Sequence, residues 1–384
     1  MKKTDRKPRA DEPLPVDWTG GLVCPGIVVS SRVRIARNLA SIPFPDRLTP
    51  DGRRSVRDAL FRRIQEGGDA RWHVCSLDGM EPDDLLRMQE CQLATPELTQ
   101  RDGGAGLLMF QPDGARTPVQ RRGRRSRVTA AKGPPPIADA LVNEEDHLRF
   151  QCITPGGALT DAYQTAFEME TALDGTAAEY AYDPTYGYLT SCPSNLGTGL
   201  RVGMMLQLVG LFLAGDLEKT LRGLERLGLE ARGIHGEGAT DAPGCLYQVS
   251  NAETLGESEE EILCRMSDIL QDLAMQEDWA RVRLFEDRPK VLEDYVCRSV
   301  AIGCEARLLS VDEAISLYYA GLFGLEMGLL ALDPIPTPYE QMRPFLPPAS
   351  AKKIAGRKHL SDDELAEMRA TVVKDIFVHF RLPG

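Results

Sequence analysis

Short segments in which apolar and polar residues alternate predict the β-strands of this chain. Residues 25–39, PGIVVSSRVRIARNL, begin as an apolar run and continue with arginines between small or apolar residues, which predicts a strand that enters a structured loop. Residues 141–157, LVNEEDHLRFQCITPGG, predict two strands on either side of an acidic turn. Residues 228–251 predict a strand, a glycine-rich loop and a second strand.

Helical spacing of apolar residues predicts helices between and after these strands. One of them, amphipathic and over 216–228, is expected to place on one face the residues Leu217, Leu221, Leu224 and Leu227. Serine followed three residues later by glutamate predicts helix starts at Ser258, Ser310 and Ser361. The predicted helices cover 51–67, 83–93, 160–174, 200–213, 216–228, 260–283, 311–330 and 362–380, and a proline-rich linker covers 333–348.

Composition and charge narrow the class of protein. The chain has 384 residues, 42% hydrophobic and 27% charged, which is typical of a globular protein with one large domain or two moderate ones. Its net charge of −12 argues against broad nucleic-acid binding, and no apolar run is long enough to span a membrane. Residues 1–20 are charged, lack the apolar core of a signal peptide and are expected to be a disordered lead-in. The nine cysteines form no C-x-x-C pair, which argues against a zinc site and a disulfide framework. The expected location is therefore the reducing cytoplasm.

Residues 115–132, ARTPVQRRGRRSRVTAAK, contain six arginines and one lysine and no acidic residue. This composition predicts a solvent-exposed inserted loop. A docking patch for an acidic partner or a polyanion is the alternative.

The usual phosphate-binding motifs are missing from the sequence. It contains no G-x-x-x-x-G-K-[ST], no H-R-D or D-F-G, and no G-x-G-x-x-G between a predicted strand and a helix. Arginines are a possible substitute, since a guanidinium stays charged and binds phosphate oxygens in a bidentate manner. Arg32 and Arg34 alternate and are therefore expected on one face of a strand. The other candidates are Arg149, Arg201 and Arg232, although each arginine alone is also compatible with a surface charge.

Two further segments contain candidate chemistry. The acidic turn Glu144, Glu145 and Asp146 is compatible with a solvated turn, or with carboxylates that hold magnesium-bound waters and a cationic substrate. Cys192 lies in the polar segment YGYLTSCPSNLGTGLR, residues 186–201, where it is either a small buried residue or a thiolate stabilised by nearby hydroxyl, amide and backbone donors.

These motifs together resemble a known family. CPSNLGTGLR, NEEDHLR and SSRVR occur here in the same order as in the phosphagen (guanidino) kinases, and RGIHGEG and YQVSN extend the resemblance to roughly residues 25–288. The finer resemblance is to the bacterial protein-arginine kinases. Unlike the phosphagen kinases, this chain has only a short lead-in before SSRVR, and its segments LTSCPSNLGTGLR and YQVSNAETLGESEEEI are closer to the bacterial branch.

The resemblance implies specific roles for the candidate residues. Glu145 and Glu237 would orient the acceptor guanidinium, with Glu145 as the base, and Cys192 would lie beside that guanidinium. Glu144 and Asp146 would lie near magnesium-bound waters. The residues that would bind ATP and its phosphates are Ser31, Arg32, Arg34, Arg149, Arg201, Arg232 and Gln248.

The resemblance also implies a fold and partners. The expected fold is α/β (α+β), with a large antiparallel sheet flanked by helices over residues 21–288 and a helical carboxy-terminal domain over 289–384. ATP and Mg²⁺ would take part in catalysis, the substrates would be proteins with exposed arginines, and the enzyme would be a cytoplasmic homodimer. An activator protein and a protease or chaperone complex are further expected partners. The alternatives are a kinase for free arginine or another small guanidino compound, and a weakly catalytic phosphoarginine-binding adaptor.

Some positions depart from the patterns of these families. Met205 and Gln248 replace a histidine and an aspartate that many phosphagen kinases place near the nucleotide, and GEGATDAPG is one residue longer than in the bacterial branch. The tail motif R-D-x-x-R-A of a phosphoarginine receptor is matched only in part by LAEMRA, where Arg369 and Ala370 fit.

Overall fold

The computed structural model describes residues 26–112, 136–174, 179–234, 242–332, 348–356 and 359–382. The lead-in over 1–20, the basic segment 115–132 and almost all of the proline-rich linker lie outside these ranges. The predictions made for those three segments therefore stay predictions.

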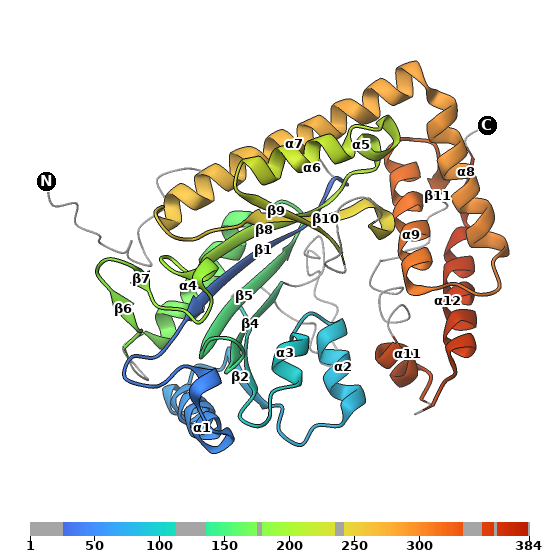
Figure 1. The fold of residues 1–384 in the computed structure, drawn as a ribbon. Helices are drawn as coiled ribbons and strands as arrows, with labels where there is room; N and C mark the ends of the chain where they lie inside the picture. The colour runs from blue at the N-terminus through green and yellow to red at the C-terminus, as the bar shows by residue number, and fades with distance from the viewer. Residues whose placement is uncertain are drawn as a thin grey trace, which may run out of the picture.

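An antiparallel sheet forms the centre of the molecule, as predicted (Figure 1). Eight strands are paired within the described residues, and every pairing is antiparallel. In spatial order they are β2 (Trp72–Ser76), β3 (Gly106–Phe110), β4 (Ile137–Val142), β5 (Leu148–Pro155), β1 (Val28–Arg37), β8 (Leu200–Gln207), β10 (Leu246–Asn251) and β9 (Leu229–Gly233).

Helices cover one face of this sheet and leave part of the other face to polar residues. Helix α4 (Leu159–Leu173) packs on β1 and β5, α7 (Glu259–Asp287) packs on β8, and α6 (Leu217–Arg226) packs on β9. On β1 the core face carries Val33 and Ile35, both fully buried, because alternate residues of a strand point to opposite faces. Figure 1 shows the long α7 on the side of the sheet formed by β8 and β10, with the short α5 (Val209–Ala214) beside it.

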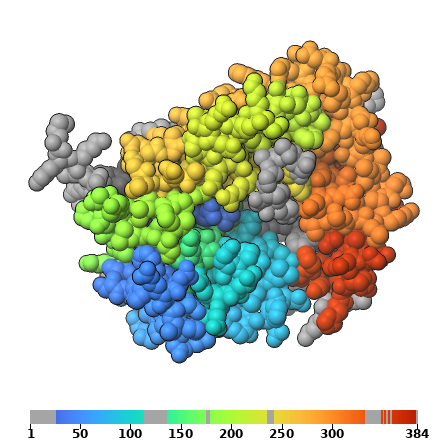
Figure 2. All heavy atoms as spheres, viewed as in Figure 1, coloured from blue at the N-terminus to red at the C-terminus, as the bar shows by residue number. Residues whose placement is uncertain are grey.

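The amino-terminal helices pack near the edge of the sheet that is formed by β2, β3 and β4. These are α1 (Pro50–Gly67), α2 (Pro82–Glu90) and α3 (Pro96–Thr99), which form the blue and cyan lower part of the space-filling view (Figure 2). A small apolar cluster joins Leu98 to Leu107 and Leu141 on the polar side of the sheet, so that α3 covers the β3–β4 end of that side. The remaining short elements are β6 (Tyr182–Asp183), β7 (Gly187–Tyr188) and the 3₁₀ helices η1 (Pro45–Arg47), η2 (Pro193–Asn195) and η3 (Pro243–Cys245).

The carboxy-terminal segment is helical, as predicted. It contains α8 (Pro289–Glu305), α9 (Val311–Glu326), α11 (Pro348–Ile354) and α12 (Asp362–Phe377), with the two-stranded pair β11 (Ala331–Leu332) and β12 (Phe380–Arg381). Leu292, Val296 and Phe323 of α8 and α9 belong to the same apolar core as the sheet. The predicted capping boxes are complete at Ser258 and Ser361, whereas at Ser310 the serine hydroxyl caps the helix by accepting from Glu313 N. None of the described helices is long and apolar enough to cross a membrane.

Two predictions about secondary structure were wrong. Residues 200–213, expected to be one helix, form strand β8 followed by the short helix α5. Leu200, Val202, Met204 and Leu206 are fully buried on one side of β8, so that this apolar run is a central strand covered by helices. Leu227, expected on the buried face of α6, is the residue after that helix and is 58% exposed.

Candidate active site

The register of the sheet brings the predicted arginines onto one polar face. Arg34 of β1 lies directly opposite Arg201 of β8 and, on its other side, opposite Gln151 of β5. In the next row Arg32 lies opposite Gly203, and Gly203 and Glu230 both lie opposite Ser250 of β10. Paired residues in an antiparallel sheet point to the same side, so these strands present a cationic surface around a glycine and a serine.

A cavity of about 280 Å³ opens over this surface. Basic, acidic and small polar side chains surround it, which is the composition expected for a charged ligand rather than an apolar one. Its lining residues are Arg34, Ala36, Glu145, Arg149, Cys192, Ser194, Asn195, Gly199, Arg201, Glu230, Arg232, Gln248 and Ser250. The prediction had named seven of these residues as contacts for ATP or the acceptor.

The arginines at the centre of the site repel one another. Burial, together with the charges of Arg32, Arg149 and Arg201, lowers the pKa of Arg34 well below its ordinary value. Burial and the neighbouring Arg149 likewise lower the pKa of Arg32 to about 10. Among the described residues Arg34 has no hydrogen-bond or ion-pair partner, and the buried Nε groups of Arg32, Arg149 and Arg201 have no hydrogen-bond partner. Unpaired cationic donors around a cavity indicate an anion-binding site.

Glu230 is an acidic member of this cluster that the sequence analysis did not select. Its Oε2 lies 2.7 Å from Arg201 Nη2 and 3.2 Å from Arg232 Nη2, so that one oxygen bridges two guanidinium groups. Arg232 is exposed at the cavity rim, while Arg201 is mostly buried and also donates to Ala252 O. The alternation of Glu230 with Arg232 along β9 was a signal that could have identified it.

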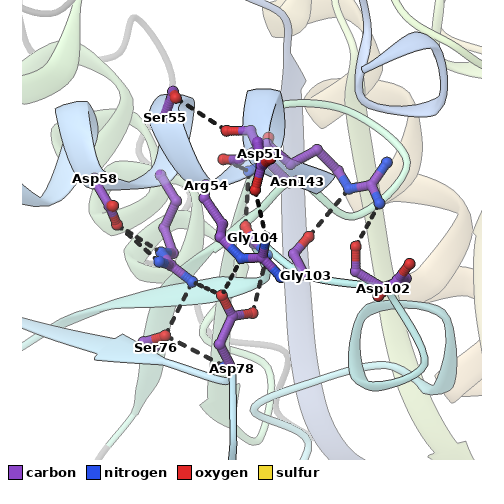
Figure 3. A network of polar contacts seen from close by, with 12 residues as sticks. Asp51, Arg54, Ser55, Asp58, Ser76, Asp78, Asp102, Gly103, Gly104 and Asn143 are labelled. Carbon is purple, nitrogen blue, oxygen red and sulfur yellow. Dashed lines mark hydrogen bonds and ion pairs between the residues drawn. The ribbon is translucent and has the colours of Figure 1, made fainter. Parts of the chain in front are cut away.

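The acidic turn between β4 and β5 is held in place by its neighbours. It begins at Asn143, whose φ of 59° is left-handed, a conformation that asparagine tolerates better than most residues. The Asn143 side chain donates to Arg53 O and Gly104 O at 2.9 and 2.8 Å. Figure 3 shows the surrounding network, in which the Asp78 carboxylate accepts from Gly104 N and from two arginines of α1. The turn therefore rests on the amino-terminal helix.

Glu144 and Asp146 face away from the cavity and have structural partners. Glu144 is buried, accepts from Thr95 Oγ1 and forms an ion pair with Arg149 at 2.7 Å. Asp146 is buried and accepts from Asn38 Nδ2 and Ser191 N. Within the described ranges no group of three or more histidine, cysteine or acidic residues is arranged to hold a metal ion. These hydrogen bonds and the ion pair hold the turn in place, and the predicted position of the two carboxylates near magnesium-bound waters stays a prediction.

Glu145, between these two residues, is the carboxylate that reaches the cavity. Burial is the main reason that its pKa is raised above the ordinary value, and the charges of Asp146 and Glu144 raise it further. Arg149 and a hydrogen bond with the Cys192 thiol act in the opposite direction. A partly buried carboxylate with a raised pKa is a stronger proton acceptor than one in water.

Cys192 lines the cavity beside Glu145, and its predicted contact with an acceptor guanidinium stays a prediction. Its Sγ lies 3.0 Å from Ser194 Oγ, and its backbone carbonyl accepts from Thr190 Oγ1. A carboxylate and a thiol thus line the same cavity as the arginines of β1, β5 and β8.

A buried arginine fixes the loop between Cys192 and β8. Arg37 is fully buried, donates to Glu170 Oε1 at 2.9 Å and to Thr198 O at 2.7 Å, and stacks over Tyr188 with Cζ 3.5 Å from the ring centre. Gly197, with a φ of 103°, touches the Thr254 backbone so closely that a Cβ would lie 2.6 Å from its carbonyl oxygen. This contact gives Gly197 a packing role, whereas Gly199 lines the cavity.

The remaining predicted residues lie in different places. Ser31 is fully buried on the opposite face from Arg32, and its hydroxyl donates to Gly156 O, so the predicted phosphate contact of this side chain is not supported. Gln248 lines the cavity, opposite Arg232 on β9. Arg32 lies under the site and donates to Gln151 Oε1. Glu237 falls outside the described residues, and its role stays a prediction.

The chain resembles characterised enzymes over most of its length. Residues 138–280 match the ATP:guanido phosphotransferase C-terminal catalytic domain. The chain is 37% identical over 336 residues to the protein-arginine kinase of Pelotomaculum thermopropionicum, which covers 86% of this chain and 87% of that protein. It is 34% identical over 357 residues to the protein-arginine kinase of Moorella thermoacetica, covering 91% and 93% of the two chains.

Solved structures of guanidino kinases share the fold. A crystal structure of lombricine kinase matches with a TM-score of 0.52 and 23% identity, over 66% of each chain. A duplicated taurocyamine kinase from Schistosoma mansoni with bound transition state analog components matches with a TM-score of 0.58 and 20% identity, over 78% of this chain and 42% of that one. The antiparallel sheet, the matching catalytic domain and the identity to the bacterial enzymes agree: this chain belongs to the protein-arginine kinase family of ATP:guanido phosphotransferases.

Proposed function

We propose that this protein is an ATP-dependent kinase that transfers the γ-phosphoryl group to the guanidinium of arginine residues in proteins. The observation that carries the proposal is a cavity lined by both kinds of charge. Glu145 and Cys192 offer a carboxylate and a thiol to a cation, and Arg34, Arg149 and Arg201 offer guanidiniums to a polyphosphate. The family membership supports the same reaction.

The chemistry follows from the charges of these acidic and basic side chains. An arginine guanidinium has a pKa of about 12.5–13.8 and is a poor nucleophile until a proton leaves it. Glu145 would accept that proton while the nitrogen attacks the γ-phosphorus, so that a P–N bond forms and the bond to the ADP oxygen breaks. The arginines would neutralise the charge of the phosphates and hold the phosphorus in line with the attacking nitrogen.

Magnesium is expected to accompany ATP, and the described residues offer it no direct ligands. Both oxygens of Glu144 face protein donors, and Asp146 has one oxygen that accepts from Asn38 and Ser191. These two carboxylates therefore do not fit an inner coordination shell, and no step above depends on the metal ion. The other Asp146 oxygen, Oδ2, is buried without a hydrogen-bond partner and is the better candidate for a water-mediated contact.

A kinase for a small guanidino compound is the second candidate. The structural neighbours named lombricine kinase and taurocyamine kinase favour it, but their likeness to this chain concerns the fold alone. The more similar bacterial relatives are named for protein substrates, which is why we place protein arginine first. A purely phosphoarginine-binding adaptor would not require Glu145 and Cys192 beside the arginines.

Further properties are proposed from the family alone. We infer a homodimer in the cytoplasm, with an activator protein and a protease or chaperone complex as partners in protein quality control. The basic segment over 115–132 is outside the described residues and carries no part of this proposal.

The test supplies ATP with an unfolded protein and, in parallel, with free L-arginine. Mass spectrometry that preserves acid-labile phosphate would locate the product, and Glu145→Ala is the control. Phosphoarginine in the protein alone, lost in the variant, is the expected result. Phosphate on free arginine alone would establish the second candidate. If ATP binds but neither product forms, the result would contradict kinase activity of the protein on its own, without an activator.

A further inference from the structure

The contact of Glu230 with Arg201 and Arg232 assigns this carboxylate a function in the phosphate subsite. Both arginines are proposed to bind ATP phosphates, and the inference rests on that proposed function. Glu230 Oε2 lies at hydrogen-bond distance from a terminal nitrogen of each guanidinium, the position that a bridging phosphate oxygen would take. No other acidic side chain is paired with Arg201 or Arg232 in the described part of the chain.

The position of Glu230 distinguishes it from the structural acids nearby. Glu144 is 2% exposed at its side chain and inaccessible, whereas the Glu230 side chain is 32% exposed and lines the cavity. It can therefore rotate into solvent when another anion approaches. Glu230 and Arg32 lie in the same row of the sheet. Only Gly203 and Ser250 lie between them, and these small residues leave space for a ligand.

We propose that Glu230 is an internal competitor that occupies the phosphate subsite, must be displaced by the incoming ligand and thereby sets the affinity of the subsite for anions. The displacement breaks two ion pairs and brings like charges together, so every anion that binds there is weakened by the same factor. ATP retains useful affinity because its nucleoside and its other phosphates make further contacts. A small anion such as inorganic phosphate has no such contacts, so the same loss leaves its binding too weak to measure.

The opposite role is physically possible and predicts the opposite result. If Glu230 oriented the two guanidiniums for ATP, its loss would release them and weaken ATP binding. The unpaired donors of Arg34, Arg149 and Arg201 argue for competition, because the cluster already has an excess of positive charge that a ligand must neutralise.

The experiment is calorimetric titration of the full chain with MgATP and, separately, with inorganic phosphate. Glu230→Gln keeps the size of the side chain and removes its charge, and Glu230→Asp keeps the charge but withdraws it by one methylene. Glu218→Gln is the matched control, because Glu218 forms an exposed pair with Arg222 on α6, away from the cavity. Thermal unfolding of each variant establishes that it is folded.

For Glu230→Gln we expect Kd to fall about fivefold for both ligands, so that phosphate binding becomes measurable, with Glu230→Asp between this variant and the native chain. Unchanged or weaker binding of both ligands in Glu230→Gln would overturn the inference. An equal gain in Glu218→Gln would also overturn it, since the effect would then come from net charge. Neither titration contains a guanidino acceptor, so a failure to form phosphoarginine would refute the proposed kinase activity without deciding the role of Glu230.

Discussion

Arg34 and Arg201 lie directly opposite one another on the neighbouring strands β1 and β8. Like charges in this position destabilise a sheet, and burial increases the cost. The pKa of Arg34 is lowered for these two reasons. The repulsion between the two arginines lowers the stability of the protein without ligand. A bound polyanion would neutralise both charges, so the same arrangement favours ligand binding.

Replacing Arg34 should therefore stabilise the protein and remove its function. We expect Arg34→Met to raise the free energy of unfolding by about 1–3 kcal/mol in the absence of ligand, because a partly buried charge with no acidic partner among the described residues is replaced by an apolar side chain. The same variant should lose the stabilisation that MgATP gives the native chain. Thermal unfolding with and without nucleotide checks both effects, and Arg222→Met on the surface of α6 is the control. A destabilised Arg34→Met would show that this cation supports the fold.

Replacing Glu145 should affect catalysis more than nucleotide binding. We expect Glu145→Gln to lower kcat by about 10²–10⁴, the usual contribution of a positioned base, while the Kd for MgATP changes little. A parallel loss of ATP affinity would place Glu145 on the phosphate side of the site instead.

The pH dependence of the native enzyme provides a second test of Glu145. The carboxylate must be ionised to accept a proton, and its pKa is raised above the ordinary value of 4.5 by burial and by its acidic neighbours. Activity should accordingly fall as the pH drops, and kcat/KM should reach half of its maximum at a pH above 4.5. The measurement is the pH profile of phosphoarginine formation at saturating ATP. An acidic limb at or below pH 4.5 would contradict the assignment.

Asp139 lies beneath the arginines and should make stability depend on pH. It is fully buried, and burial raises its pKa to about 7 from 3.8. The folded state thus favours the protonated acid, whose stabilising contribution is complete below pH 3.8 and is lost as the pH rises through 7. Asp139→Asn cannot ionise and should exceed the native chain in stability by up to about 4 kcal/mol above pH 7.

Denaturant unfolding of Asp139→Asn between pH 4 and pH 8 checks this prediction. The difference from the native chain should grow over that interval and then level off. Asp161→Asn, which removes an exposed carboxylate on α4, should show no comparable trend. A constant difference for Asp139→Asn across the interval would mean that the native aspartate stays ionised throughout.

The Arg37–Glu170 ion pair should be essential for stability. Both side chains are fully buried, and Arg37 also donates to Thr198 O in the loop that precedes β8. We expect Glu170→Gln to lower the free energy of unfolding by about 3–5 kcal/mol, because it leaves a buried cation without its main counter-charge. Arg298→Gln, which breaks an exposed pair on α8, should change stability by less than about 0.5 kcal/mol. Equal effects of the two variants would contradict the structural role of Arg37.

The local features of this protein could be predicted from its sequence. The alternation of Arg32 and Arg34 with Val33 and Ile35 determined which side of β1 is polar, because the period of a strand is two residues. The capping boxes at Ser258 and Ser361 were equally readable, since a cap depends on residues three positions apart. The motifs around Glu145 and Cys192 indicated the family and two residues that line the cavity.

Tertiary structure decided what depends on distant residues. The run from Leu200 to Gln207 became a strand because it fills the gap between β1 and β10, a choice that its own apolar pattern could not make. Strand register placed Arg201 opposite Arg34 and brought Glu230 to the same cavity, and it turned Ser31 to the other face. Glu144, already close to Arg149 in sequence, became a partner of Thr95 only because the start of α3 packs against this turn. A sequence pattern reports the preferences of neighbours along the chain, whereas the charges that meet in this site are joined by pairing between strands far apart in it.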